Sequence, residues 1–135
     1  MRTYVLLILL FPAIVSSSCK KDLTNEVDIT QSLWIVKSIK TDKEQLKPDH
    51  EYILEFLNDS LFNLNLSVNS GGGKYKLVSK GNILIDTFDP YTEICCENDF
   101  DNSLLYLLPK VIEYEVLRNI LIFKSSEGEI EFKKE

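Results

Sequence analysis

The sequence predicts a mainly β (α+β) fold: a small, closed or partly closed antiparallel β-barrel of about eight short strands with one short helix. Three observations carry this prediction. Apolar and polar residues alternate along several short segments, turn-forming residues separate these segments at near-regular spacing, and one stretch has the period of a helix. Closing such a sheet would remove the exposed strand edges that otherwise promote aggregation.

The first predicted strand covers residues 33–40. Simple alternation places Trp34 and Val36 on one face and Ile39 on the other. A hairpin follows, because two alternating segments, 51–57 and 62–68, flank the turn-forming sequence Asn58-Asp59-Ser60.

The glycine run 71–73 is predicted to be a hairpin turn, with the positive φ angles that glycine tolerates best. It would lead into a strand at 75–78, a second turn at Lys80-Gly81-Asn82 and a strand at 83–85. We expect Gly73 to be structurally important for this reason.

The second half of the domain contains the helix. Phe100, Leu104, Leu107 and Leu108 recur at helical spacing, and we expect Asp99 or Asp101 to cap the N-terminus. Pro109 should end the helix after about two turns. Three further strands are predicted at 112–116, 120–123 and 130–132.

The N-terminal segment is predicted to be an export signal rather than part of the fold. Residues 5–15 are an apolar run that is shorter than the ~20 residues needed to span a bilayer, and Arg2 precedes it. Three serines and then Cys19 follow. This pattern resembles a bacterial lipoprotein signal, although Ser16 stands where leucine is usual.

Two interpretations of Cys19 are open: ordinary secretion that leaves a stray thiol, or lipidation of Cys19 as the new N-terminus. We favour lipidation, which would attach a diacylglycerol and an acyl chain, since two or more chains anchor a protein stably. The predicted organisation is a lipoprotein signal peptide (1–18), a lipidated N-terminus and tether (19–31) and a β domain (32–135).

Composition narrows the classes of partner. The chain has 135 residues, enough for one domain, and a formal net charge of −6. This acidity argues against nucleic acid as a partner, because phosphate backbones are bound by basic surfaces. We predict a monomer whose partner is the membrane, through its anchor, in the cell envelope and specifically on the outer membrane of a Gram-negative bacterium.

A set of motifs follows in order between residues 31 and 132: Trp34 with Ser38-Ile39, Asn69-x-x-x-Gly73-x-Tyr75, Thr92-x-x-x-Cys96, Val111-x-x-Tyr114-x-Val116 and Asn119-x-Leu121. Their order and spacing resemble the META domain family, which includes a heat-inducible bacterial lipoprotein.

The resemblance implies a compact barrel-like domain with one helix. It does not imply an enzyme, since the family looks like envelope and stress-associated proteins of undefined molecular activity, and we predict no cofactor. One feature departs from the family, which often has Gly-Cys directly before the motif asparagine. Ser67-Val68 stand there in this chain, so a disulfide from that position is impossible.

The cysteines and the acidic loop are the strongest candidates for chemistry. Cys95 and Cys96 are adjacent, but adjacent Cα atoms lie about 3.8 Å apart, so a disulfide between them would be strained. We favour one buried and one peripheral thiol. Asp99-x-Asp101 resembles the start of a calcium loop, yet Leu104 and Lys110 replace the glycine and glutamate that such a loop requires.

The remaining candidates are weak. His50 is the single histidine, lies between two acids and has no nucleophile motif nearby. We therefore predict a non-catalytic, lipid-anchored envelope protein that binds or scaffolds, with no metal site. The alternative is a lipocalin-like barrel that holds a small apolar ligand, which would require an unfilled interior.

Overall fold

The computed structural model describes residues 28–86, 88–92 and 96–135, so the predicted signal peptide and most of the tether lie outside the described residues. The elements follow one another in this order: η1 (Ile29–Gln31), β1 (Leu33–Thr41), β2 (Gln45–Leu46), β3 (Ile53–Phe56), β4 (Leu61–Asn65), β5 (Ser70–Ser79), β6 (Asn82–Ile85), β7 (Asp89–Pro90), α1 (Asp99–Leu107), η2 (Leu108–Lys110), β8 (Glu113–Leu117), β9 (Ile120–Lys124) and β10 (Gly128–Lys134).

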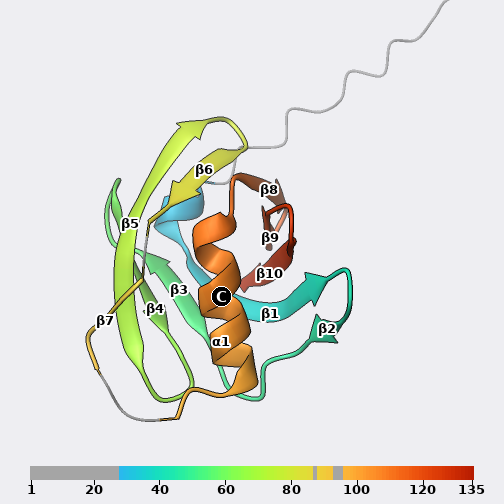
Figure 1. Ribbon diagram of the computed structural model, residues 1–135. Helices are drawn as coiled ribbons and strands as arrows, with labels where there is room; N and C mark the ends of the chain where they lie inside the picture. Colours follow the sequence, from blue (N-terminus) through green and yellow to red (C-terminus); the bar gives the residue numbers. More distant parts are fainter. Residues whose placement is uncertain (1–27, 87, 93–95) are drawn as a thin grey trace, which may run out of the picture.

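All strands pair antiparallel in one sheet with the order β10-β9-β8-β6-β5-β4-β3-β1-β2, and β7 pairs with β5. β10 also pairs with β1 along almost its whole length, which closes the sheet into a ring (Figure 1). The joint between β6 and β8 is short and pairs Asn82 with Glu113. The result is a partly closed ring rather than a regular barrel, which confirms the predicted fold class.

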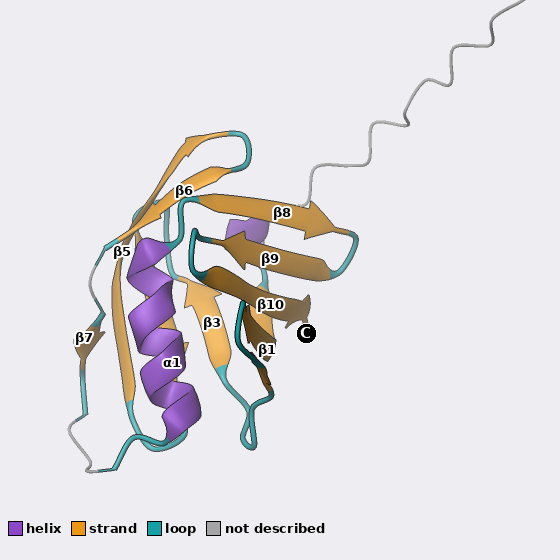
Figure 2. Cartoon of the chain, turned by 45° about the vertical axis from the view of Figure 1, so that its right-hand side comes forward, coloured by secondary structure: helices purple, strands orange, loops and turns teal. Residues whose placement is uncertain are grey.

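α1 lies against the concave side of this curved sheet in both views (Figures 1 and 2). Its inward face buries Phe100, Leu104 and Leu107, and the Phe100 ring packs 4.9 Å from the ring of Tyr52. The helix ends at Leu107, two residues before Pro109, as predicted. The helix therefore fills space that the strands alone would leave open.

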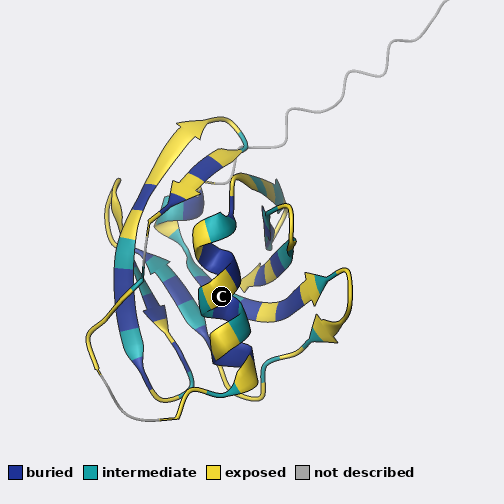
Figure 3. Ribbon diagram, viewed as in Figure 1, coloured by how far each residue is buried: buried dark blue, intermediate teal, exposed yellow. Residues whose placement is uncertain are grey.

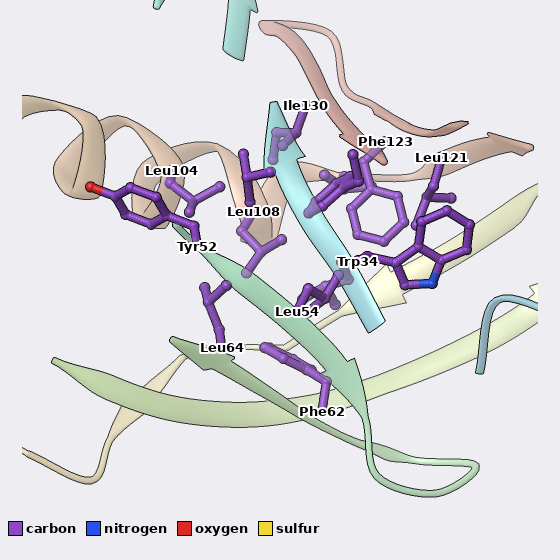
Figure 4. Close-up of a cluster of buried hydrophobic side chains, with 14 of the residues drawn as sticks. Trp34, Tyr52, Leu54, Phe62, Leu64, Leu104, Leu108, Leu121, Phe123 and Ile130 are labelled. Atoms are coloured by element: carbon purple, nitrogen blue, oxygen red, sulfur yellow. The ribbon is translucent and has the colours of Figure 1, made fainter. Parts of the chain in front are cut away.

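Apolar side chains occupy the interior of the ring (Figure 4), and buried and exposed positions alternate along the strands (Figure 3). The five largest fully buried side chains come from β1, β4, β9 and β10 or directly precede β3: Trp34, Tyr52, Phe62, Phe123 and Phe132. Phe123 and Phe132 also meet edge to face at 4.9 Å. These large side chains fill the centre of the ring and leave little room for a ligand there.

The structure corrects the predicted faces of the first strand. Ile39 is buried together with Val36, not opposite to it. The pairing with β10 shifts by one residue between Val36 and Ser38, and this bulge at Lys37 returns Ile39 to the inner face, where it opposes Ile130. The alternation of apolar and polar residues in the sequence does not show where a bulge inserts an extra residue, so it could not predict the change of face after Lys37.

The structure also corrects the glycine run. Residues 71–73 belong to β5 and pair with β4, with Gly71 opposite Leu64 and Gly73 opposite Phe62. Among the described glycines the positive φ angle occurs at Gly81 (82°), in the turn predicted between β5 and β6. The positive φ expected at Gly73 was therefore wrong, and the hairpin turn lies earlier, where the Leu66 amide donates to the Asn69 carbonyl over 2.8 Å.

Candidate functional site

The most concentrated group of buried polar side chains lies where α1 begins. Asp101, in the first turn of α1, has no exposed surface. Its carboxylate accepts hydrogen bonds from the Ser67 hydroxyl, from the Ser67 amide over 3.3 Å and from the Asn98 amide over 3.2 Å. These contacts join the helix to the loop between β4 and β5. A buried carboxylate is tolerated because hydrogen-bond donors surround it.

The N-cap of α1 is Asn98. The predicted caps, Asp99 and Asp101, were therefore wrong, since they lie one and three residues further along the chain. The Asn98 side chain accepts from the Asp101 amide over 2.8 Å, and Asp101 returns the bond to the Asn98 amide, which forms a capping box. The side-chain Nδ2 of Asn98 also donates a hydrogen bond to the Tyr52 hydroxyl over 3.1 Å. Burial is the main cause that raises the pKa of Tyr52 above 10.0.

Two residues of the predicted motifs meet beside this network. Asn69 is buried, and its side-chain oxygen accepts a hydrogen bond from the Thr92 hydroxyl over 3.1 Å. The Thr92 hydroxyl oxygen in turn accepts from the Ser70 amide over 3.0 Å. Asn69 and Thr92, which belong to different motifs, are thus 23 residues apart in sequence and adjacent in space. Their contact holds the chain after β7 against the start of β5.

The other motif residues make separate structural contacts. The buried Trp34 indole donates to the Ile29 carbonyl over 2.8 Å, which ties η1 to the ring. The Tyr75 hydroxyl donates to the Asn58 carbonyl over 2.6 Å, and burial together with the nearby carboxylates Asp59 and Asp28 raises the Tyr75 pKa above 10.0. Tyr114 packs partly buried against the core.

The predicted cysteine positions fall partly outside the described residues, where Cys19 and Cys95 both lie. Cys96 is exposed and has a φ angle of 84°. This left-handed conformation is uncommon for residues other than glycine, asparagine and aspartate, and it turns the chain toward the N-cap of α1. By its exposure, Cys96 is a peripheral thiol, which bears on one half of the predicted pair.

The acidic and histidine candidates do not gather into a reactive group. His50 is exposed, and its Nδ1 lies 2.8 Å from the neighbouring Asp49 carboxylate. Within the described residues, no group of three or more histidine, cysteine, aspartate or glutamate side chains is arranged to hold a metal ion. Ser67 and Asp101 form a hydroxyl–carboxylate pair, but the single histidine is bonded elsewhere.

An open groove of about 550 Å³ runs along the outer face of α1, between the β1–β2 hairpin and the turn before β10. Tyr106 and Glu127 line it, and the Tyr106 hydroxyl donates to Glu127 over 2.8 Å. Lys110 lies 3.3 Å above the Tyr106 ring and 2.6 Å from Glu127, and the Lys110 contact is the main cause that lowers the Glu127 pKa. This groove lies on the surface and is separate from the filled interior.

Sequence reasoning missed the Asp101 network, apart from proposing Asp101 as a cap. The available signal was the spacing Asn98-x-x-Asp101 at the start of a helical period, which matches the spacing of a capping box. Nothing in the sequence indicated Ser67 or Tyr52, because their role depends on strands that are distant along the chain.

Comparisons with known proteins support the fold. No protein-family model matches this chain, and no curated protein does. The crystal structure of a DUF4847 family protein from Bacteroides vulgatus ATCC 8482 is similar, with a TM-score of 0.59 and 16% sequence identity over 77% of this chain and 92% of that one. At this identity the likeness concerns the fold alone. Among the described residues no helix is long and apolar enough to span a bilayer.

Proposed function

We propose that this chain is a lipid-anchored cell-envelope protein whose META-like domain binds or scaffolds rather than catalyses. The observation that carries the proposal is Cys19, placed directly after an apolar run and three serines and nine residues before the first described residue, Asp28. A cysteine at this position is the attachment residue of a lipoprotein signal, and the short stretch after it is long enough for a tether.

The contacts of the motif residues support a non-catalytic role. Trp34, Asn69, Tyr75 and Thr92 use their polar groups for hydrogen bonds within the domain, to carbonyls, amides and each other. Catalytic side chains usually face a cleft where a substrate can reach them. The residues of the META-like motifs are therefore best explained as fold-determining.

The filled interior favours this proposal over a lipocalin-like carrier. A carrier needs an internal cavity for its ligand, whereas large side chains such as Trp34, Phe62 and Phe123 occupy the centre of the ring (Figure 4). The groove beside α1 offers surface space for a partner, and both polar residues such as Thr41 and apolar ones such as Ile39 line it.

The test is metabolic labelling with palmitate in a bacterium that processes lipoproteins, with separation by detergent phase. The wild-type chain should carry label and enter the detergent phase. Cys19→Ala should lose the label and leave the detergent phase, because the acyl chains are the anchor. Cys96→Ala is the matched control, since it removes a cysteine elsewhere and should keep the label. An unlabelled wild-type chain, or a Cys19→Ala variant that still partitions into detergent, contradicts the proposal.

A further inference from the structure

We infer that one end of the ring, which we call the tether end, rests against the lipid surface that holds the anchor. The tether end consists of η1, the β3–β4 turn, the β5–β6 turn, the β8–β9 turn and the C-terminal residues of β10. This inference rests on the proposed lipid anchor, and it adds which face of the domain the membrane touches.

Strand registers place these segments together. The Glu135 amide donates to the Leu33 carbonyl over 3.1 Å and the Lys134 amide to the Asn119 carbonyl over 2.8 Å, so the end of β10 joins the start of β1, which directly follows η1, to the β8–β9 turn. The Tyr114 amide donates to the Gly81 carbonyl over 2.8 Å, which brings β8 to the β5–β6 turn.

The β3–β4 turn is the last segment of the tether end, and it lies beside β5. The hydroxyl of Tyr75 reaches Asn58 in this turn, and the charges of both Asp59 and Asp28 act on the Tyr75 phenol. The start of the described chain lies near the top of Figure 1, toward the turn between β5 and β6, whereas α1 begins near the bottom.

The tether cannot carry the domain far from the membrane. Asp28 lies nine residues after Cys19, and a fully extended chain advances about 3.3–3.6 Å per residue, so the reach is at most about 32 Å. Asp28 adjoins η1, which Trp34 and β3 hold against the ring. The tether therefore leaves the domain at the tether end, and this end is the part of the domain nearest to the anchor.

Exposed apolar side chains project from the tips of the tether end. Leu57 is 52% exposed, Val78 55% and Leu117 52%, each beside a different turn. Leu61 and Leu77 are also exposed next to these tips. Apolar residues on separate loop tips at one end suit shallow insertion between lipid headgroups, because each tip can enter without burying strand backbone.

The charges of the domain favour the same orientation. Six exposed cations lie at the tether end: Lys74, Lys76, Lys80, Arg118, Lys133 and Lys134. Six acids, Asp28, Glu55, Asp59, Glu113, Glu115 and Glu135, lie among them, so this end is close to neutral although the chain carries −6.

The opposite end is acidic. The described residues 88–92 and 96–101, which contain β7 and the start of α1, include no lysine or arginine. Anionic lipids attract nearby cations and repel acids, so the tether end meets the membrane with the least repulsion, and the start of α1 faces away from it.

The test uses the full lipidated protein, purified and placed in vesicles of phosphatidylethanolamine and phosphatidylglycerol that contain a lipid with brominated acyl chains. A fluorescent amino acid is introduced at Val78, at Leu117 or, as the matched control at the opposite end, at Tyr91, which is 63% exposed. Bromine quenches fluorophores that enter the bilayer. We expect quenching at Val78 and Leu117 to exceed that at Tyr91 by about fivefold, since loop tips at the tether end would enter the headgroup layer.

A charge variant checks the electrostatic part. The paired change Lys76→Glu and Arg118→Glu should lower the quenching at Val78 by about half in phosphatidylglycerol vesicles and leave it unchanged in neutral phosphatidylcholine vesicles. Equal or stronger quenching at Tyr91, with Cys19 lipidated and the protein bound to vesicles, overturns the inferred face and leaves the anchor intact. Absence of lipid on Cys19 by mass spectrometry overturns both.

Discussion

Asp101 ties the helix to the sheet through a carboxylate that water does not reach. Three donors, the hydroxyl and amide of Ser67 and the amide of Asn98, converge on it. Removing the carboxylate would leave these buried donors without acceptors, which costs more than the bonds themselves contribute.

We therefore expect Asp101→Ala to lower the free energy of unfolding by about 3 kcal/mol. Asp99→Ala is the control, since Asp99 is an exposed acid in the same helical turn and should cost about 0.5 kcal/mol through the helix dipole. Urea unfolding of the domain from residue 20 onward measures both. Similar losses for the two variants would show that charge near the helix terminus, rather than the buried network, is what matters.

Tyr52 and Tyr75 make the domain sensitive to alkali. Burial raises the pKa of both above 10.0, so the neutral phenol is favoured in the folded state. The stability that results is fully present below about pH 10 and is lost as the pH rises through the raised folded pKa.

We expect a tyrosinate absorbance titration of the folded protein to show a step at higher pH than any step of the urea-unfolded chain. Two phenols, those of Tyr52 and Tyr75, should contribute to this step. Tyr52→Phe and Tyr75→Phe should each remove one part. Tyr75→Phe should also cost about 1 kcal/mol at neutral pH, because the bond to the Asn58 carbonyl is lost. A native titration that coincides with the unfolded one contradicts the burial of these hydroxyls.

At the scale of elements, the glycine run lets two strands approach closely. A Cβ atom on Gly71 would collide with the Asp89 carbonyl and the Phe88 ring, and one on Gly72 with the Phe62 carbonyl and the Tyr91 hydroxyl. β7 can therefore pair with β5 only because these positions lack side chains. The sequence indicated that the run matters, but for the wrong reason, since at Gly71 and Gly72 the demand is for space rather than for a positive φ.

Two alanine variants separate these reasons. Gly71→Ala should destabilise the domain by about 2–3 kcal/mol through overpacking. Gly81→Ala should cost about 1 kcal/mol, because Gly81 has a φ of 82° but a Cβ atom there would lie 3.6 Å from its nearest neighbour, the Tyr114 carbonyl oxygen. Thermal melts rank the two variants. If Gly81→Ala is the more damaging, conformation rather than close approach dominates in this region.

At the scale of the whole molecule, the pairing of β1 with β10 joins the two ends of the domain. Phe132 of β10 opposes Val36 of β1 and Leu121 of β9, and its ring meets Phe123. It is fully buried, so it links the closing strand to the core. Ring closure and core packing therefore depend on the same residue.

We expect Phe132→Ala to cost about 3–5 kcal/mol, because it leaves a cavity at the closing joint. Leu117→Ala, at the end of β8 and 52% exposed, should change stability by less than about 0.5 kcal/mol. Denaturant unfolding compares them. A small loss for Phe132→Ala would indicate that the ring is stable without its last strand.

The sequence by itself determined the fold class, the main strands and the position and end of the helix. These features follow from local alternation, turn residues and Pro109, which act over a few neighbouring positions. Two strands of two residues, β2 and β7, escaped prediction because segments so short have no period to detect.

Only the tertiary structure decided how these segments meet. The bulge at Lys37 places Ile39 in the core. The close pairing of β7 with β5 explains why β5 contains glycines at the paired positions. The pairing of Asn69 with Thr92, and of Ser67 with Asp101, joins residues 23 and 34 positions apart. Such contacts depend on register and strand order, which arise from burying one face of every strand in a common core and leave no local trace in the chain.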